Sequence, residues 1–324
     1  MTKIDLKDRK ILYELDRNCR QSNTQIGKKV GLKKDVVSYR IKKLQEEGVI
    51  NKFYAAIDSF KLGYDVFRIY INFQYITQKK KEEIIKYFVD YKYSWVVVTI
   101  KSEIDLDVVV WVKDIFEFYN FLEKTLDKFE EYFEKYAISI YVYASCYKKD
   151  FLLKDELPGY KREMYEVRCG VKSVEIDEID YKLLNELAVN GRAQLIELAE
   201  KVGCSSQSVN YRIKNLMKSG VINSLRVELN LSTLNFKHYR VDIYLKDHRM
   251  KRPIFNYLKD KPYLEYMNLS MGWADLEPEF IVKDMDELLK IMEEINSNFS
   301  GAIKKQFFWV TEKFHKLRCL PDLY

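Results

Sequence analysis

Two short segments concentrate side chains that can hydrogen-bond to nucleic acid. Residues 33–43 and 205–214 mix Lys and Arg with Ser, Asn, Gln and Tyr. Such side chains can donate to phosphate oxygens and to the acceptors that base edges present in the major groove. The predicted DNA-contacting residues are Lys33, Lys34, Ser38, Tyr39, Arg40, Lys42 and Lys43 in the first segment, and Ser206, Gln207, Asn210, Tyr211, Arg212 and Lys214 in the second.

Catalytic and metal-binding patterns are missing from the sequence. None of the three histidines, His238, His248 and His315, has a second His or a carboxylate at a diagnostic spacing. The five cysteines are scattered without a metal-ligand pair, and there is no Gly-rich phosphate loop or nucleophile elbow. We therefore predict a chain that is not an enzyme and holds neither a metal nor a cofactor.

The two segments lie in a repeat that predicts how they are presented. Residues 8–51 align without a gap onto residues 180–223, at an offset of 172, with 20 of 44 positions identical. In the first copy the apolar spacing predicts a helix over about 8–18, a short second helix that ends at Gly31, and a third over about 34–47. This order is the helix-turn-helix pattern, in which the last helix enters the major groove of DNA.

A helical wheel separates the buried and exposed faces of the third helix. Its apolar stripe, Val37, Ile41 and Leu44, returns as Val209, Ile213 and Leu216. The predicted DNA-contacting positions mostly face away from this stripe. Two pairs stay open: Arg40 and Arg212 fit an ion pair within the module as well as a phosphate contact, and Tyr39 and Tyr211 fit packing as well as DNA contact.

The two modules differ in charge. Residues 1–52 hold 14 Lys and Arg against 7 Asp and Glu, whereas residues 174–226 hold 7 of each. The net charge of the chain is +6, so the first module supplies its positive charge. Neutralising phosphates contributes affinity through counterion release, so we expect the first module to bind DNA more tightly than the second.

Each module is followed by a strand-helix-strand-strand-helix-strand pattern. We therefore predict an α+β chain with two winged helix-turn-helix domains, each followed by a ferredoxin-like βαββαβ domain. The predicted strands are 67–73, 95–100, 106–112 and 138–144, then 239–245, 264–269, 280–282 and 307–310. The predicted domains are 1–52 (helix-turn-helix), 53–150 (ferredoxin-like), 151–173 (linker), 174–226 (helix-turn-helix) and 227–324 (ferredoxin-like).

These motifs resemble the leucine-responsive and asparagine-regulator (Lrp/AsnC) family of transcription factors. The resemblance is carried by Ile26-Gly27-Lys28-Lys29-Val30-Gly31 and Tyr39-Arg40-Ile41-Lys42-Lys43-Leu44, and by their counterparts at 198–203 and 211–216. It implies a sequence-specific regulator of double-stranded DNA, with a C-terminal domain that senses an effector and dimerises. Because both units share one chain, we expect an intrachain pseudo-dimer that can associate further.

The resemblance also implies an effector site at a Gly-x-x-Asp turn between the two central strands. The second unit reads Gly272-Trp273-Ala274-Asp275, and an amino acid is the expected effector there. The first unit reads Ser102-Glu103-Ile104-Asp105, which keeps only Asp105 of the motif. Gly272, Asp275 and Asp105 are therefore the predicted effector-binding residues.

Two other functions fit the same architecture. Tetrapyrrole decarboxylases of the sirohaem type resemble these regulators, and a helix-turn-helix chain can serve as a dimerisation partner that no longer binds DNA. The basic first module favours DNA binding over both. No run of about 20 apolar residues is present, so we expect no membrane association and a cytoplasmic location.

Overall fold

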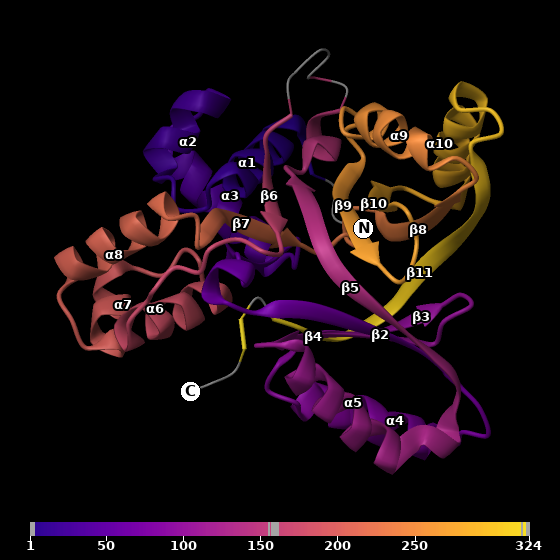
Figure 1. The fold of residues 1–324 in the computed structure, drawn as a ribbon. Coiled ribbons are helices and arrows are strands. Elements are labelled where there is room, and N and C mark those ends of the chain that lie inside the picture. Colours follow the sequence, from indigo (N-terminus) through magenta and orange to yellow (C-terminus); the bar gives the residue numbers. More distant parts are fainter. Residues whose placement is uncertain (1–3, 155, 157–161, 319, 322–324) are drawn as a thin grey trace.

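The computed structural model describes residues 4–154, 156, 162–318 and 320–321. Figure 1 shows two helical modules on one side of the molecule and an assembly of long strands, covered by further helices, on the other. Within the described ranges, no helix is both long and apolar enough to cross a bilayer.

The first helical module consists of α1 (Leu6–Arg17), α2 (Asn23–Val30), α3 (Lys34–Glu46) and strand β1 (Ile50–Ile57). α1 begins before the predicted residue 8 because Asp5 and Asp8 form a capping box, in which each carboxylate accepts the backbone N–H of the other residue. Gly31 ends α2 at a φ of +68°, a conformation that glycine adopts without steric cost.

The second helical module repeats this order and joins the first. It consists of α6 (Glu178–Val189), α7 (Leu195–Val202), α8 (Ser206–Lys218) and strand β7 (Ile222–Leu229). β1 and β7 pair antiparallel, with Phe53 opposite Val227. Buried side chains of both modules form a single hydrophobic cluster. The two modules are therefore one structural unit.

The predicted ferredoxin-like domains are confirmed. The first contains β2 (Asp65–Phe73), α4 (Gln78–Asp90), β3 (Ser94–Lys101), β4 (Leu106–Val112), α5 (Ile115–Phe129) and β5 (Phe133–Tyr147). The second contains β8 (Lys237–Leu245), α9 (Lys251–Leu258), β9 (Leu264–Met271), β10 (Glu277–Val282), α10 (Met285–Asn298) and β11 (Ile303–Leu317). Short 3-10 helices lie at Phe60–Leu62, Glu130–Tyr132, Asp150–Leu153 and His248–Met250.

The two ferredoxin-like domains share one continuous sheet. Strand β3 of the first half pairs with β11 of the second, and β5 pairs with β9. The sheet order is β2-β4-β3-β11-β8-β10-β9-β5-β6, and β2 also pairs with β5. The eight long strands thus close into a ring that both halves complete, while β6 lies outside it.

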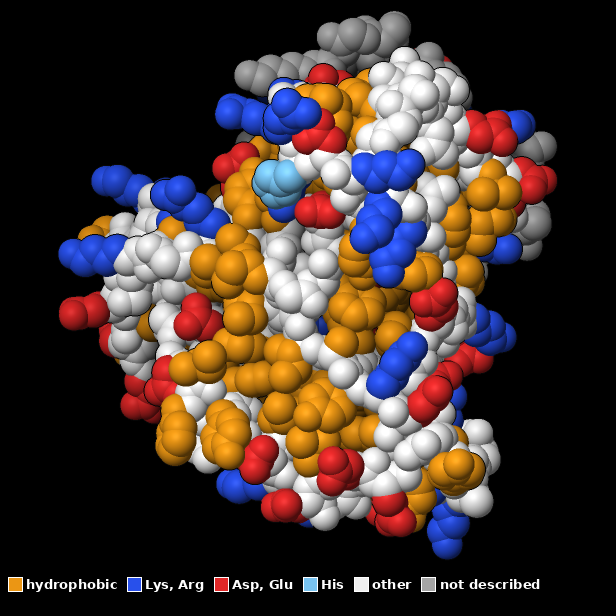
Figure 2. Space-filling model, turned by 45° about the vertical axis from the view of Figure 1, so that its right-hand side comes forward, with side chains coloured by type: hydrophobic (Ala, Val, Ile, Leu, Met, Phe, Trp, Pro, Cys, Tyr) orange, Lys and Arg blue, Asp and Glu red, His pale blue; other side chains and the backbone are white. Residues whose placement is uncertain are grey.

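Each pair of helices covers the outer face of its own part of the ring (Figure 1). α4 and α5 bury Phe88 and Phe118 against β2 and β4, and α9 and α10 bury Ile254 and Leu288 against β8 and β10. Figure 2 shows apolar side chains gathered over the centre of one face of the molecule, with charged side chains of both signs around them.

The predicted linker 151–173 carries structure of its own. Phe151–Leu153 are buried in the core of the helical modules, and β6 (Met164–Arg168) pairs with β5 at the edge of the sheet. Residues 155 and 157–161 of this segment lie outside the described residues. The segment therefore connects the modules to the sheet through packed contacts.

Candidate nucleic-acid interface and effector site

The outward faces of α3 and α8 are exposed as the helical wheel predicts. Val37, Ile41 and Leu44 are buried, as are their counterparts in α8. Tyr39 and Tyr211 are each 67% exposed, so neither packs against a flanking segment. The exposed polar positions are Lys34, Asp35, Ser38, Lys42, Lys43, Gln45 and Glu46 on α3, and Gln207, Asn210, Lys214, Asn215 and Lys218 on α8, where Ser206 is half-buried.

Arg40 and Arg212 take part in matching ion pairs inside the two modules. Arg40 donates to Asp5 and Asp8 at 2.8 and 2.7 Å. Arg212 pairs with Asp177 and Asp180, both at 2.8 Å. These contacts fasten each third helix to the start of its first helix, which is the structural role that the sequence left open. A phosphate contact from either arginine stays a prediction.

The basic side chains of the first module differ in the strength of their ion pairs. Lys29 is held by Glu14 at 2.6 Å, whereas Lys42 and Lys43 form only exposed pairs of 3.6 and 3.7 Å with Glu46 and Glu47. Such exposed pairs are weak. In the described ranges Lys33 and Lys34 have no ion pair. Lys33, Lys34, Lys42 and Lys43 are therefore available to contact phosphate.

The N-termini of the two third helices also differ. Ser205 caps α8 by accepting the backbone N–H of Ser208, whereas Lys33 at the same place in α3 provides no side-chain cap. The first N–H groups of a helix carry a partial positive charge and bind anions well. The start of α3 thus presents uncapped N–H groups beside the ammonium groups of Lys33 and Lys34.

A pair of arginines that the sequence analysis did not single out locks the two modules together. Arg20 donates to the carbonyl oxygens of Gly191 and Ala193 at 3.1 and 2.8 Å. Arg192, its counterpart in the repeat, donates to the carbonyl oxygens of Cys19 and Gln21 and to the Asn23 side chain. The signal was present, since Arg20 and Arg192 are identical in the gapless alignment.

Backbone contacts extend this lock to the strands. The N–H of Cys19 donates to Leu225 of β7 at 2.8 Å, and the N–H of Gly191 donates to Phe53 of β1 at 2.9 Å. Each module therefore docks the end of its first helix on the strand of the other. The spacing between α3 and α8 is consequently fixed within one chain.

A buried charge cluster connects the modules to the sheet ring. Arg226 of β7 pairs with Asp16 of α1 through two contacts of 2.8 Å, and both side chains are fully buried. The Lys148 ammonium, at the end of β5, donates to Ser224 at 2.6 Å and to the Asp16 carbonyl oxygen at 3.1 Å. Burial and the charge of Arg226 lower the pKa of Lys148 to about 8.

The predicted effector residues occupy hairpin turns inside the ring. The Asp275 carboxylate accepts the backbone N–H of Leu245 at 2.8 Å, and Asp105 accepts that of Phe73 at 2.9 Å. Gly272 has a φ of +88°, and a Cβ there would lie 2.7 Å from the Ile138 oxygen of β5. These residues hold matching turns of the two halves, and an effector role for them stays a prediction.

The turn at Gly272 leads into a buried ionic network between the halves. Trp273 donates to Asp242, which also accepts from Arg240 at 2.8 Å. Across the interface, Arg68 donates to Glu277 at 2.8 Å, and Arg240 donates to the Tyr70 hydroxyl at 2.6 Å. Burial raises the pKa of Asp242 to about 6, although Arg240 acts in the opposite direction.

The histidines are dispersed over the second half. His238 contacts Glu279 at 2.9 Å, His248 lies 3.6 Å from Asp275, and His315 contacts the Thr99 hydroxyl at 3.2 Å. Among the residues that the structure describes, no group of three or more His, Cys, Asp or Glu side chains is placed to hold a metal ion.

Comparison with known sequences identifies both modules. The family described as "Winged helix-turn-helix DNA-binding" matches residues 4–51 and 176–223. The HTH-type transcriptional regulator Ptr1 of Methanocaldococcus jannaschii is 31% identical over 120 residues, which cover 37% of this chain and 80% of that protein. The proline dehydrogenase transcriptional activator of Rhodobacter capsulatus is 42% identical over 122 residues, covering 37% of this chain and 79% of the activator.

A further relative matches over a shorter stretch. The leucine-responsive regulatory protein of Rhizobium meliloti is 44% identical over 66 residues, and the chain spans 42% of its length.

Solved structures add a likeness that covers the whole chain. The siroheme decarboxylase NirDL superposes with a TM-score of 0.66 over 98% of this chain and 94% of its own, at 12% identity. Its co-complex with an iron-uroporphyrin III analogue gives a TM-score of 0.65 over 96% of this chain and 92% of its own, also at 12% identity. At such identity the likeness concerns the fold.

This likeness corrects one prediction. The sequence led us to expect a chain that is not an enzyme, but the fold that spans its full length is that of an enzyme. The missing catalytic motifs were a poor guide because the function of a fold resides in individual side chains that need no recognisable spacing. Ptr1 and the proline dehydrogenase activator are named as transcription regulators, and each matches little more than one third of this chain. With its two winged helix-turn-helix modules, the chain belongs to the Lrp/AsnC family and carries two copies of the family's unit in tandem.

Proposed function

We propose that the chain is a sequence-specific transcription regulator that binds double-stranded DNA as an intrachain pseudo-dimer in the cytoplasm. The observation that carries this proposal is the matched presentation of α3 and α8. Both helices expose the same face, with Tyr39 and Tyr211 equally accessible. Arg20 and Arg192 hold the two helices at a fixed spacing, as a reader of two half-sites requires.

The two recognition helices have different tasks in this proposal. α3 supplies most of the affinity, because its uncapped N-terminus and Lys33, Lys34, Lys42 and Lys43 face phosphates. α8 supplies mainly base reading through Gln207 and Asn210, whose amides fit the donor and acceptor pair of adenine. Ser38 and Tyr39 are further candidates for reading on α3.

The salt dependence of binding tests the electrostatic part. Replacing Lys42 and Lys43 by Gln should weaken DNA binding and reduce the slope of log K against log salt by about one per lost phosphate contact. Lys86→Gln, which removes an exposed ion-paired lysine on α4, serves as the control and should leave the slope unchanged. An unchanged slope in the double variant would refute the assignment.

An amino-acid effector at the Gly272 to Asp275 turn is the regulatory part of the proposal. The turn contacts β5 of the other half, so a ligand that moves it would act on the pairing of the halves. Operator affinity measured with each amino acid in turn tests this. If no amino acid changes the affinity, the effector assignment fails and the DNA-binding assignment stands.

A second candidate function is removal of a carboxylate from a tetrapyrrole. The whole-chain fold likeness to a siroheme decarboxylase favours it. Sirohaem mixed with the purified chain should then show the absorbance shift of a bound tetrapyrrole and release carbon dioxide under turnover conditions. Neither change would occur in a chain that acts as a regulator alone.

A further inference from the structure

A groove of about 850 Å³ lies between α4 and β11, away from the proposed DNA interface. α4 belongs to the first half and β11 to the second, so the groove exists only where the halves pair. The Lys316 ammonium on β11 donates to the carbonyl oxygens of Val89 and Tyr91 at 2.8 Å each. This contact fastens the strand to the end of α4 and keeps both walls in place.

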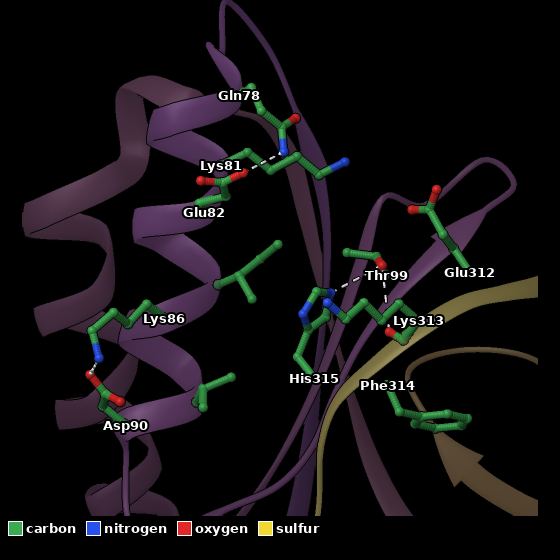
Figure 3. A pocket seen from close by; sticks show the side chains of 12 residues that line it. Gln78, Lys81, Glu82, Lys86, Asp90, Thr99, Glu312, Lys313, Phe314 and His315 are labelled. Carbon is green, nitrogen blue, oxygen red and sulfur yellow. Dashed lines mark hydrogen bonds and ion pairs between the residues drawn. The ribbon is translucent and has the colours of Figure 1, made fainter.

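Basic side chains from both walls converge in the groove. Figure 3 shows Lys81 pointing from α4 across the gap, and Lys313 and His315 pointing from β11 toward the helix. In the described ranges, neither Lys81 nor Lys313 forms an ion pair. The buried Thr99 hydroxyl lies 3.2 Å from Nε2 of His315. Burial, then the charge of Lys313, lower the pKa of His315, although the charge of Glu312 acts in the opposite direction.

The acidic side chains that line the groove already have partners. Glu82 accepts from Gln78 at 2.8 Å, Asp90 pairs with Lys86 at 2.7 Å, and Glu312 pairs with Lys101 at 3.4 Å. Among the described residues, neither Lys81 nor Lys313 is the ion-pair partner of any of these acids.

The equivalent place in the other half is filled. β5 pairs with β9 as β11 pairs with β3, which places Tyr143 where β11 has Lys313 and Ser145 where it has Lys316. The Tyr143 ring packs 6.3 Å from that of Phe255 on α9, and its hydroxyl contacts Ser145 at 2.8 Å. The two halves have therefore diverged into one aromatic contact and one open, cationic groove.

We propose that the groove between α4 and β11 binds a small organic anion, a carboxylate carried on an apolar body. The carboxylate would lie between the ammonium groups of Lys81 and Lys313, which bind anions as point charges. The apolar body would contact Ile85 and Val89, which line the α4 wall. Because the walls come from different halves, such a ligand stabilises their pairing.

The test titrates the full chain with phenylacetate and with indole-3-acetate. With only three histidines in the chain, proton NMR can follow the imidazole signals, and His315→Gln assigns the relevant one. Either acid should shift the His315 signal saturably. Replacing both Lys81 and Lys313 by Met should weaken that binding at least about tenfold, while Lys79→Met, an exposed lysine of α4 outside the groove, should not.

Three results would overturn the proposal: no saturable shift with either acid, equal affinity in the double variant, or inorganic phosphate bound as tightly as the organic acids. Equally tight binding of phosphate would show that contact with an apolar body does not contribute to affinity. The inference goes beyond DNA binding, so the double variant should keep the operator affinity of the parent chain, and a failure here leaves the proposed regulator intact.

Discussion

Identical residues in the two copies serve two purposes. Arg40 and Arg212 close ion pairs within their own modules, whereas Arg20 and Arg192 reach across to the other module. The sequence cannot separate these uses, because both pairs lie in the same gapless alignment. The helical wheel did predict the exposed face of each third helix, since burial of an apolar stripe is a local property.

Residues that differ between the two copies mark the positions at which the copies have diverged. Lys33 stands where the second copy has its capping serine, and Lys313 stands where β5 has Tyr143. The first difference is visible in the alignment of the modules. The second depends on the strand register, so only the structure shows it.

Removal of the Asp16 carboxylate should destabilise the fold severely. Asp16→Asn removes the closest counter-charge of the buried Arg226 guanidinium and leaves only Glu265 at 3.9 Å, and such changes cost about 3–5 kcal/mol. Urea denaturation measures the loss of unfolding free energy. The control Asp90→Asn, which breaks an exposed pair, should cost less than about 1 kcal/mol. Equal losses would show that the buried pair contributes little.

At the scale of elements, the residue at the N-terminus of a recognition helix affects both the stability of the helix and its ability to bind phosphate. The N-terminus of α8 is capped by a serine, which stabilises the helix. The N-terminus of α3 has a lysine at the same position and no side-chain cap. This difference can be recognised in the sequence, because capping depends on the residue next to the helix, Ser205 in one copy and Lys33 in the other.

Lys33→Ser should therefore act in opposite directions on folding and on DNA binding. A serine cap should stabilise α3 by about 1 kcal/mol, while the loss of a phosphate contact should weaken DNA binding and lower the salt slope by about one. Thermal unfolding and a salt titration of binding report the two effects. Unchanged DNA affinity in this variant would remove Lys33 from the interface.

The arginine lock should control the spacing of the recognition helices. The parent chain should prefer one half-site spacing, and replacing Arg20 and Arg192 by Met should lower that preference by about tenfold, or 1.4 kcal/mol. A series of operators with different spacers measures it. Arg168→Met, on the exposed edge strand β6, should keep the parent preference. An unchanged preference in the double variant would assign the spacing to β1 and β7 alone.

At the scale of the whole molecule, the halves close one ring of strands through β3–β11 and β5–β9. The apolar pattern predicted a strand at each place in the ring, although β5 and β11 extend well beyond the predicted 138–144 and 307–310. The pattern does not say which edges of the two sheets meet. Pairing between edges depends on side chains such as Arg68 and Glu277, which are distant in sequence. Motifs did not favour the enzyme alternative, because the full-length likeness to a siroheme decarboxylase is one of fold, at 12% identity.

The buried network at the ring should make stability depend on pH. Burial raises the pKa of Asp242 to about 6, above the value of about 3.9 for an unfolded chain. The folded state therefore binds this proton more tightly, so its contribution is complete below pH 4 and is lost as pH rises through about 6. The loss should be on the order of 1–3 kcal/mol.

Urea unfolding at several pH values checks this prediction. The parent chain should lose stability between pH 4 and pH 7, and Asp242→Asn should flatten that part of the profile. Asp90→Asn, an exposed carboxylate on α4, should keep the parent profile. If the stability of Asp242→Asn depended on pH as strongly as that of the parent chain, another group would be responsible for the pH dependence.

The stoichiometry of binding to selected DNA decides whether one chain presents two working recognition helices. DNA fragments selected by the purified chain should contain two inverted half-sites about one helical turn, roughly 34 Å, or a multiple apart. The mass of the complex should correspond to one chain per such site. A single half-site per chain, or a palindrome that requires two chains, would show that only one module of each chain binds DNA.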